Sequence, residues 1–144
     1  MHVFPVSAAS RTAMVMVLLA LGACASVPRE SDAARLSRLQ AFAGPPVNSI
    51  LYTSTGSGFD VVDDSHVLLM LGPRRNYLLR VDPQCLAWDG ASPTLMIRSG
   101  MTGQLSVNFD AIVTRSPPGL TCAIREIRPV DLKAAREAEK QAAG

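Results

Sequence analysis

Five residues within a single seven-residue stretch carry side chains that could do chemistry: Asp60, Asp63, Asp64, Ser65 and His66. A serine, a histidine and a carboxylate form a hydrolytic triad only when the fold turns all three toward one another. Neighbouring residues on a strand or turn point in different directions, and no nucleophile elbow surrounds Ser65. The sequence therefore does not support a hydrolase.

The same stretch offers three carboxylates and one imidazole to a metal ion. It lacks the glycine-hinged alternation and the terminal glutamate of a calcium loop, and no second histidine is near. We expect a solvated acidic turn between two strands, with no metal, no cofactor and no catalytic residue.

Three cysteines, Cys24, Cys85 and Cys122, offer thiol chemistry. Cys24 follows a nine-residue apolar segment, residues 13–21, which has Arg11 before it and small residues after it. This is the anatomy of a secretory signal peptide. The apolar run is too short to cross a bilayer, which takes ~20 residues.

The leader ends in residues 21–24 (LGAC), which resemble the lipobox of bacterial lipoproteins. The resemblance implies that residues 1–23 are removed, that Cys24 receives a diacylglycerol, and that the acyl chains hold the protein stably on a membrane. Ala25, in place of aspartate, implies the inner leaflet of the outer membrane, facing the periplasm. The alternative is cleavage at the small-x-small pattern of residues 23–25, which would release a soluble periplasmic protein.

Export would place Cys85 and Cys122 in an oxidising compartment, where a disulfide forms and persists. Such a bridge would remove roughly 4 kcal/mol of unfolded-chain entropy. The alternative is a pair of buried free thiols that pack as small hydrophobic groups. No Cys-x-x-Cys motif is present, which argues against a redox role.

Arginines are the remaining candidates for binding. Arg74 and Arg75 stand at the tip of a predicted hairpin, where they could contact lipid phosphates or an anionic polymer; the alternative is a solubilising loop. Four more arginines would form a basic patch only if they share a face: Arg98, Arg115, Arg125 and Arg128.

Two further features have structural interpretations. Residues 55–58 (TGSG) lack the ending of a phosphate-binding loop and open no helix, so they predict a flexible hairpin turn. Trp88, three residues after Cys85, is expected to pack over the disulfide or a sheet edge.

These side chains are positioned by a chain with mainly strand-like patterning. Short β-prone runs separated by turn signals occur at residues 50–53, 59–62, 66–71, 76–81, 94–98, 105–110 and 122–127. Residues 105–110 alternate apolar and polar, which predicts one buried and one wet face. Leu36, Leu39 and Phe42 predict a short amphipathic helix over residues 32–42. The polar segment after Asp131 predicts a solvated helix capped by that residue.

We predict a mainly β (α+β) fold: a small antiparallel sheet, sandwich or partly closed barrel of six to seven strands, with a short N-terminal helix and a polar C-terminal helix. The absence of βαβ alternation excludes doubly wound folds. The expected organisation is a leader (1–23), a lipidated tether (24–34), a single β-rich periplasmic domain (35–131) and a polar tail or helix (132–144).

The lipobox, residues 75–79 (RNYLL), Cys85, residues 109–110 (FD) and residues 122–130 (CAIREIRPV) together carry a family resemblance. Over about residues 46–131, the chain resembles an uncharacterised family of small proteobacterial lipoproteins, the domain of unknown function 6491. The family implies pairing of the two later cysteines. It brings no activity, ligand or catalytic residue.

We therefore expect a lipid-anchored cell-envelope protein, held to the membrane through Cys24, that acts as a non-enzymatic structural or interaction module with an envelope protein partner. A small-ligand-binding β-domain is the alternative, and an enzyme is the third hypothesis. The formal net charge of +2 argues against nucleic acid as a partner, because phosphate binding depends on clustered Lys and Arg.

Overall fold

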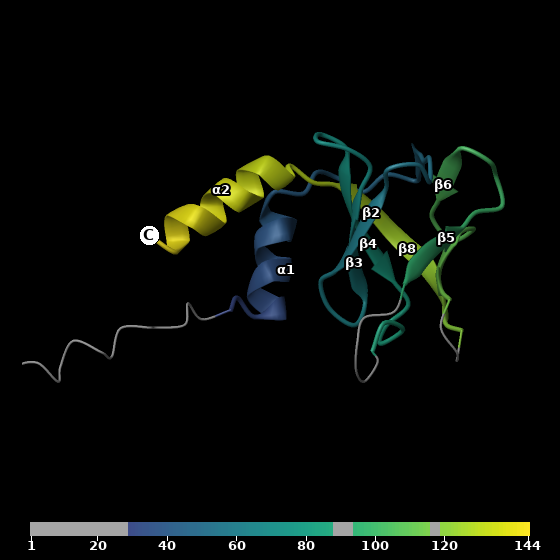
Figure 1. Ribbon diagram of the computed structural model, residues 1–144, viewed down its shortest axis with the longest axis horizontal. Helices are drawn as coiled ribbons and strands as arrows, with labels where there is room; N and C mark the ends of the chain where they lie inside the picture. Colours follow the sequence, from purple (N-terminus) through teal and green to yellow (C-terminus); the bar gives the residue numbers. More distant parts are fainter. Residues whose placement is uncertain (1–28, 88–93, 116–118) are drawn as a thin grey trace, which may run out of the picture.

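A computed structural model describes residues 29–87, 94–115 and 119–144 (Figure 1). The elements in chain order are α1 (Asp32–Ala41), β1 (Ser49–Leu51), β2 (Gly58–Val61), β3 (His66–Met70), β4 (Asn76–Val81), β5 (Leu95–Arg98), β6 (Gln104–Ser106), β7 (Ala111–Thr114), β8 (Thr121–Pro129) and α2 (Leu132–Ala142). The predicted leader, the lipobox with Cys24, and Trp88 lie outside the described residues.

Six strands form one antiparallel sheet in the order β2-β3-β4-β8-β7-β5, and β1 pairs with β6 in a separate two-stranded ribbon. A bridge between Val47 and Ile127 joins the segment before β1 to β8. Together the two sheets make a nearly closed, barrel-like body (Figure 1). The prediction of a mainly β fold is confirmed, with eight strands in place of six or seven.

The hairpin of β3 and β4 forms as the sequence predicts. Its strands read as continuous apolar runs because both faces of the sheet are covered. Val67 and Leu69 face the interior of the barrel-like body, whereas Leu68 faces the helices. The turn is closed by a hydrogen bond from the N–H of Leu71 to the carbonyl of Arg75, at 2.8 Å.

The interior of the barrel-like body is filled by aliphatic side chains. Fully buried members come from five different strands: Val67, Leu79, Leu105, Ile112 and Ile124. A disulfide joins Cys85 to Cys122, with the Cα atoms 5.7 Å apart, and Cys122 belongs to the same core. The bridge expected from the sequence is therefore present.

A second core lies between the outer face of the sheet and the two helices, which Figure 1 shows on one side of the strands. Helix α1 buries Leu39 there and is N-capped by Ser31. Helix α2 is capped by Asp131, as predicted, but it is not solvated all round, because its first turn buries Leu132 and Ala135. One apolar turn is enough to attach α2 to the second core, since only this end of the helix reaches the sheet. Within the described residues, neither helix has the length and apolarity needed to cross a membrane.

The predicted strand over residues 105–110 is wrong after Ser106. The chain turns at Asn108, whose φ is 64°, in the left-handed region. Phe109 is 87% exposed and Asp110 is 3% exposed, the reverse of the expected alternation. Asp110 turns inward because its carboxylate accepts hydrogen bonds from the backbone N–H groups of Gly100, in the loop before β6, and of Ser106, the last residue of β6.

Two other local predictions need correction. Strand β7, which the sequence analysis does not predict, pairs with both β5 and β8. Residues 55–58 do not close a hairpin, because β1 pairs with β6; they carry the chain from the ribbon to β2. Gly56 has a φ of 75°, which explains glycine at that turn.

Candidate functional site

Ser65, His66 and Asp63 meet in the turn between β2 and β3, so the expectation that they diverge is wrong. The Nδ1 atom of His66 lies 2.9 Å from Oδ1 of Asp63 and 3.4 Å from Oγ of Ser65. A hydrolytic triad needs the serine and the carboxylate on different ring nitrogens. Here both approach the same nitrogen, so the arrangement is not a triad.

The hydrogen bonds of this turn instead hold Asp63 in its charged form. Burial alone would raise the pKa of Asp63, but hydrogen bonds from the backbone N–H of Ser65, at 2.8 Å, and from His66 lower that pKa below its ordinary value. Asp60 does not join the group, since it pairs with Arg35. No set of three or more His, Cys, Asp or Glu residues in the described ranges is arranged to hold a metal ion.

The candidate arginines do not form one patch. Arg75 donates to the carbonyl oxygen of Leu51 at 2.6 Å. Arg74 is exposed and borders a separate surface pocket, next to Pro129 and Lys133. Three of the other arginines contact separate groups: Arg115 approaches Met96 Sδ, Arg125 pairs with Asp82, and Arg128 pairs with Glu126. Arg98 is exposed at the end of β5.

Three large apolar side chains are exposed together on and beside the β1–β6 ribbon: Leu51 (74%), Met101 (60%) and Phe109 (87%). We call them the apolar patch. Strand alternation turns Ile50 and Leu105 into the core, so Leu51 lies on the outer side of the ribbon. A surface pocket of about 710 Å³ is bordered by the other two patch residues and by uncharged polar side chains of the ribbon.

The turn that carries Phe109 is held rigidly. The Asp110 carboxylate accepts hydrogen bonds from the N–H groups of Gly100, at 2.8 Å, and Ser106, at 2.6 Å. The N–H of Asn108 donates to Ile124 of β8 at 2.8 Å, and the N–H of Ile124 donates back to Asp110 at 3.0 Å. The exposure of Phe109 is therefore imposed by the fold and does not reflect a loose chain.

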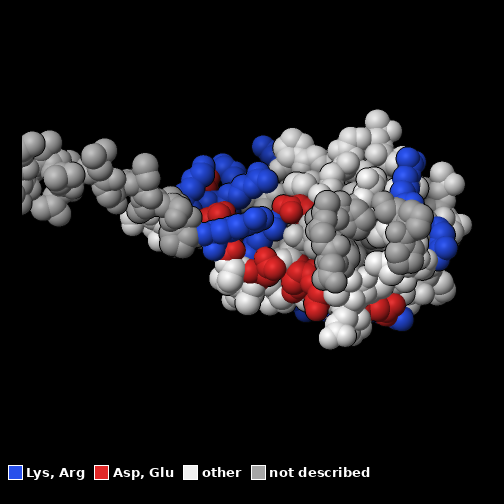
Figure 2. All heavy atoms as spheres, turned by 60° about the horizontal axis from the view of Figure 1, so that its bottom comes forward, with Lys and Arg blue, Asp and Glu red and all other residues white. Residues whose placement is uncertain are grey.

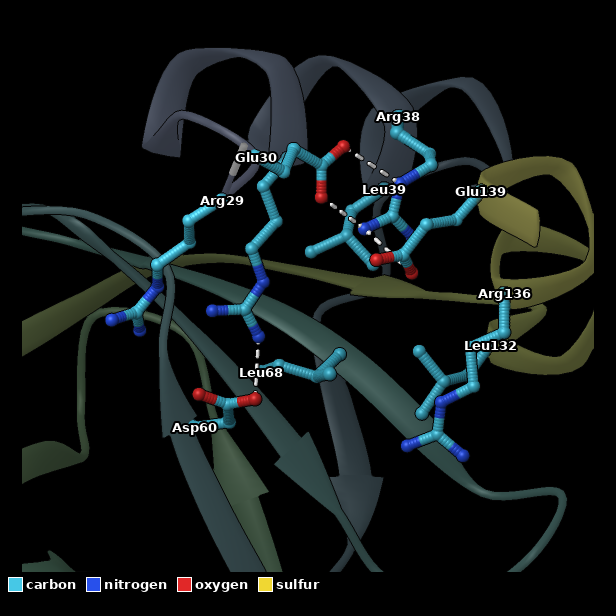
Figure 3. Close-up of a pocket in the computed structure, with 10 residues that line it drawn as sticks. Arg29, Glu30, Arg38, Leu39, Asp60, Leu68, Leu132, Arg136 and Glu139 are labelled. Atoms are coloured by element: carbon cyan, nitrogen blue, oxygen red, sulfur yellow. Dashed lines mark hydrogen bonds and ion pairs between the residues drawn. The ribbon is translucent and has the colours of Figure 1, made fainter. Parts of the chain in front are cut away.

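A second surface feature lies between α1, α2 and β2. Four arginines, Arg29, Arg35, Arg38 and Arg136, border a pocket of about 600 Å³, which we call the arginine pocket (Figure 3). It lies at the helical end of the molecule, where Figure 2 shows Lys and Arg side chains gathered with acidic side chains among them.

Arg38 links the two helices at this pocket. Its guanidinium group pairs with Glu30 at 2.5 Å and with Glu139 of α2 at 3.2 Å, and it donates to the carbonyl oxygen of Ala135 at 3.2 Å. The hydrogen bond between Arg38 and Glu30 lowers the pKa of Glu30 and raises that of Arg38. Both groups stay ionised across the physiological pH range.

The sequence matches the family of unknown function DUF6491 over residues 7–144. The chain belongs to this family. The match extends beyond residues 46–131, on which the resemblance was recognised, and includes both helices. No curated protein and no solved structure matches the chain.

The residues that carried the DUF6491 resemblance have clear structural places. Residues 76–79 lie in β4 at the centre of the large sheet, and Cys85 and Cys122 form the disulfide. Phe109 and Asp110 are the exposed tip and the buried support of one turn.

Most residues of both surface features were missed by sequence reasoning. Phe109 was expected in a strand, and Leu51 and Met101 have no local signal that separates them from core residues. For the arginine pocket, the only available signal was the spacing of Arg35 and Arg38, which places them near one face of a helix.

Proposed function

We propose that this protein is a lipid-anchored module of the bacterial cell envelope, without enzymatic activity, that binds an envelope protein through the apolar patch. The observation that carries the proposal is Phe109, a large aromatic side chain 87% exposed on a turn fixed by the buried Asp110. Met101 and Phe109 border a surface pocket, and exposed apolar side chains of this kind are typical of protein interaction sites. A rigidly held aromatic residue is the type that dominates binding energy in such interfaces.

The position of the patch supports an anchored module. The β1–β6 ribbon lies at the opposite end of the molecule from α1 (Figure 1). The lipobox at residues 21–24 precedes α1, so acyl chains on Cys24 would attach at the helical end. Such a molecule, on the inner leaflet of the outer membrane, would present the patch to the periplasm.

The chemistry of the patch indicates the kind of partner. Of the described residues that border its pocket, Asp110 alone is ionisable, and its carboxylate is occupied by backbone N–H groups. A charged side chain of a partner would therefore find no free opposite charge among the described residues of this pocket. The complementary surface is an apolar, uncharged segment of another protein.

A small apolar ligand is the second candidate. The pocket at the patch, at about 710 Å³, falls within the range that small-molecule sites occupy. The interior of the barrel-like body argues against a ligand there, because aliphatic side chains fill it. A ligand would therefore occupy the same surface as the proposed partner.

The test is photo-crosslinking in cells. A photoreactive phenylalanine analogue at position 109 should give a discrete protein adduct, whereas the same analogue at the exposed Gln141 of α2 should not give that adduct. Identical adducts from both positions, or none from position 109, would contradict the patch as the docking surface. An adduct smaller than a protein would support the ligand.

The anchor is tested by mass spectrometry of the mature protein. We expect a chain that begins at an acylated Cys24. An unmodified chain that begins at Ser26 would contradict the lipid anchor and leave the patch untouched as a proposal.

A further inference from the structure

Two guanidinium groups of the arginine pocket have no acidic partner within the part of the chain that the structure describes. Arg35 and Arg38 are neutralised by the carboxylates that border the pocket. Across residues 29–87, 94–115 and 119–144, no carboxylate forms an ion pair with Arg29 or Arg136. The pocket therefore carries a local excess of positive charge.

The geometry of the pocket suits an anion with an attached apolar group. In Figure 3 the side chains of Arg29 and Arg136 lie on opposite sides of the pocket, with Leu68 between them. Leu39, Leu68 and Leu132 are almost fully buried and form an apolar floor. A cationic rim over an apolar floor matches a phosphate ester that carries a hydrocarbon portion.

The position of the pocket along the chain brings it close to the proposed anchor. Only five peptide units separate Cys24 from Arg29, so the two Cα atoms lie at most ~17 Å apart. The polar layer on each side of a bilayer is about 5 to 8 Å thick. A chain acylated at Cys24 therefore keeps Arg29 within reach of the headgroups.

We propose that the arginine pocket binds the phosphate of an anionic phospholipid in the leaflet that holds the protein. This assignment rests on the proposed lipid anchor. Guanidinium groups bind phosphate oxygens through paired hydrogen bonds. Arg29, in the segment before α1, and Arg136, on α2, supply one guanidinium group each. The headgroup contact turns the helical end toward the membrane and the apolar patch away from it.

The experiment uses the full chain isolated from membranes and reconstituted into phosphatidylethanolamine vesicles that contain phosphatidylglycerol and a trace of photoactivatable phosphatidylglycerol. The test variant is Arg29→Gln with Arg136→Gln. The matched control is Arg98→Gln with Arg115→Gln, which removes the same charge from exposed residues on or next to strands of the far sheet edge. Circular dichroism checks that both variants are folded.

We expect the test variant to lose at least about fivefold in lipid adduct and the control to match the wild type, because each arginine near an anionic surface contributes about fivefold in binding. Equal losses in both variants would overturn the assignment in favour of diffuse charge attraction. A free-anion site would give two other results together: millimolar inorganic phosphate would abolish the wild-type lipid adduct, and inorganic phosphate would also bind the protein in detergent without vesicles. That outcome would overturn the assignment.

Flotation separates this proposal from the anchor on which it rests. A chain that fails to float with the vesicles refutes the lipid anchor, and the headgroup site falls with it. A chain that floats but shows no difference between the two variants refutes only the headgroup site.

Discussion

The carboxylate of Asp110 accepts a hydrogen bond from the backbone N–H of Ser106 at 2.6 Å, and this contact fixes the direction of the preceding residue, Phe109. The same carboxylate accepts from the N–H of Gly100 at 2.8 Å, so one buried side chain ties the loop before β6 to the last residue of that strand. Phe109 is thereby turned to the solvent. A polar residue in the interior is what keeps an apolar one on the surface.

Replacing Asp110 with alanine should destabilise the protein by about 2–4 kcal/mol, because two partly buried N–H groups would lose their charged acceptor. Asp110→Asn keeps one acceptor oxygen and should cost about half as much. Urea unfolding measures both values. Amide hydrogen exchange at Gly100 and Ser106 should accelerate most in the alanine variant, and unchanged exchange there would contradict the role of Asp110.

The parts of the fold that local patterns determine could be predicted. The β3–β4 hairpin follows from two apolar runs around turn residues, and the cap Asp131 follows from residue type. The direction of Phe109 could not be predicted, because it depends on bonds between Asp110 and backbone groups up to ten residues away. The arginine pocket could not be predicted either, because it joins the two helices through contacts such as that of Arg38 with Ala135, which are 97 residues apart in the chain.

Replacing Phe109 with serine should leave the free energy of unfolding within about 0.5 kcal/mol of the wild type, because the side chain packs against little in the free protein. The fully buried Leu105, four residues earlier, is the contrast: Leu105→Ala should cost about 2–5 kcal/mol. Thermal unfolding compares the two. A large loss of stability in the Phe109 variant would show that this side chain has a structural role.

Loss of the Cys85–Cys122 disulfide should reduce the free energy of unfolding by about 4 kcal/mol, because the bridge closes a loop across 37 positions of the chain. Urea unfolding of the wild type with and without a reductant measures the effect. The Cys85→Ala, Cys122→Ala double variant should behave like the reduced wild type and should not respond to reductant. Equal unfolding midpoints for oxidised and reduced protein would contradict a stabilising bridge.

Asp63 should make stability depend on acidic pH. Its pKa is lower in the folded chain than its ordinary value of 3.8, so the ionised form favours folding. This contribution is complete above 3.8 and is lost as the pH falls through the depressed folded pKa. Asp63→Asn should therefore cost about 1 kcal/mol at pH 7, and the difference from the wild type should disappear once the pH is below the depressed folded pKa of Asp63.

The matched control for this titration is Asp64→Asn in the same turn. Asp64 is exposed, and its side chain accepts only from the Ser65 hydroxyl, at 3.1 Å, among the described residues. Its substitution should change stability little at any pH. A difference between the wild type and the Asp63 variant that persists unchanged at low pH would contradict the linkage.

Replacing Arg38 with methionine should loosen α2 while most of the sheet stays intact. The substitution removes the ion pairs that Arg38 makes with Glu30 and Glu139 and leaves those two carboxylates near each other without their shared cation. Since the Arg38 side chain is 15% exposed, these charged hydrogen bonds should contribute about 1–3 kcal/mol. Amide hydrogen exchange should rise along α2 and stay unchanged in β4.

Lys133→Met is the control, because the exposed pair of Lys133 with Glu137, at 3.9 Å, should contribute well under 1 kcal/mol. Equal exchange in the two variants would mean that the apolar contacts of Leu132 and Ala135 alone hold the helix against the sheet.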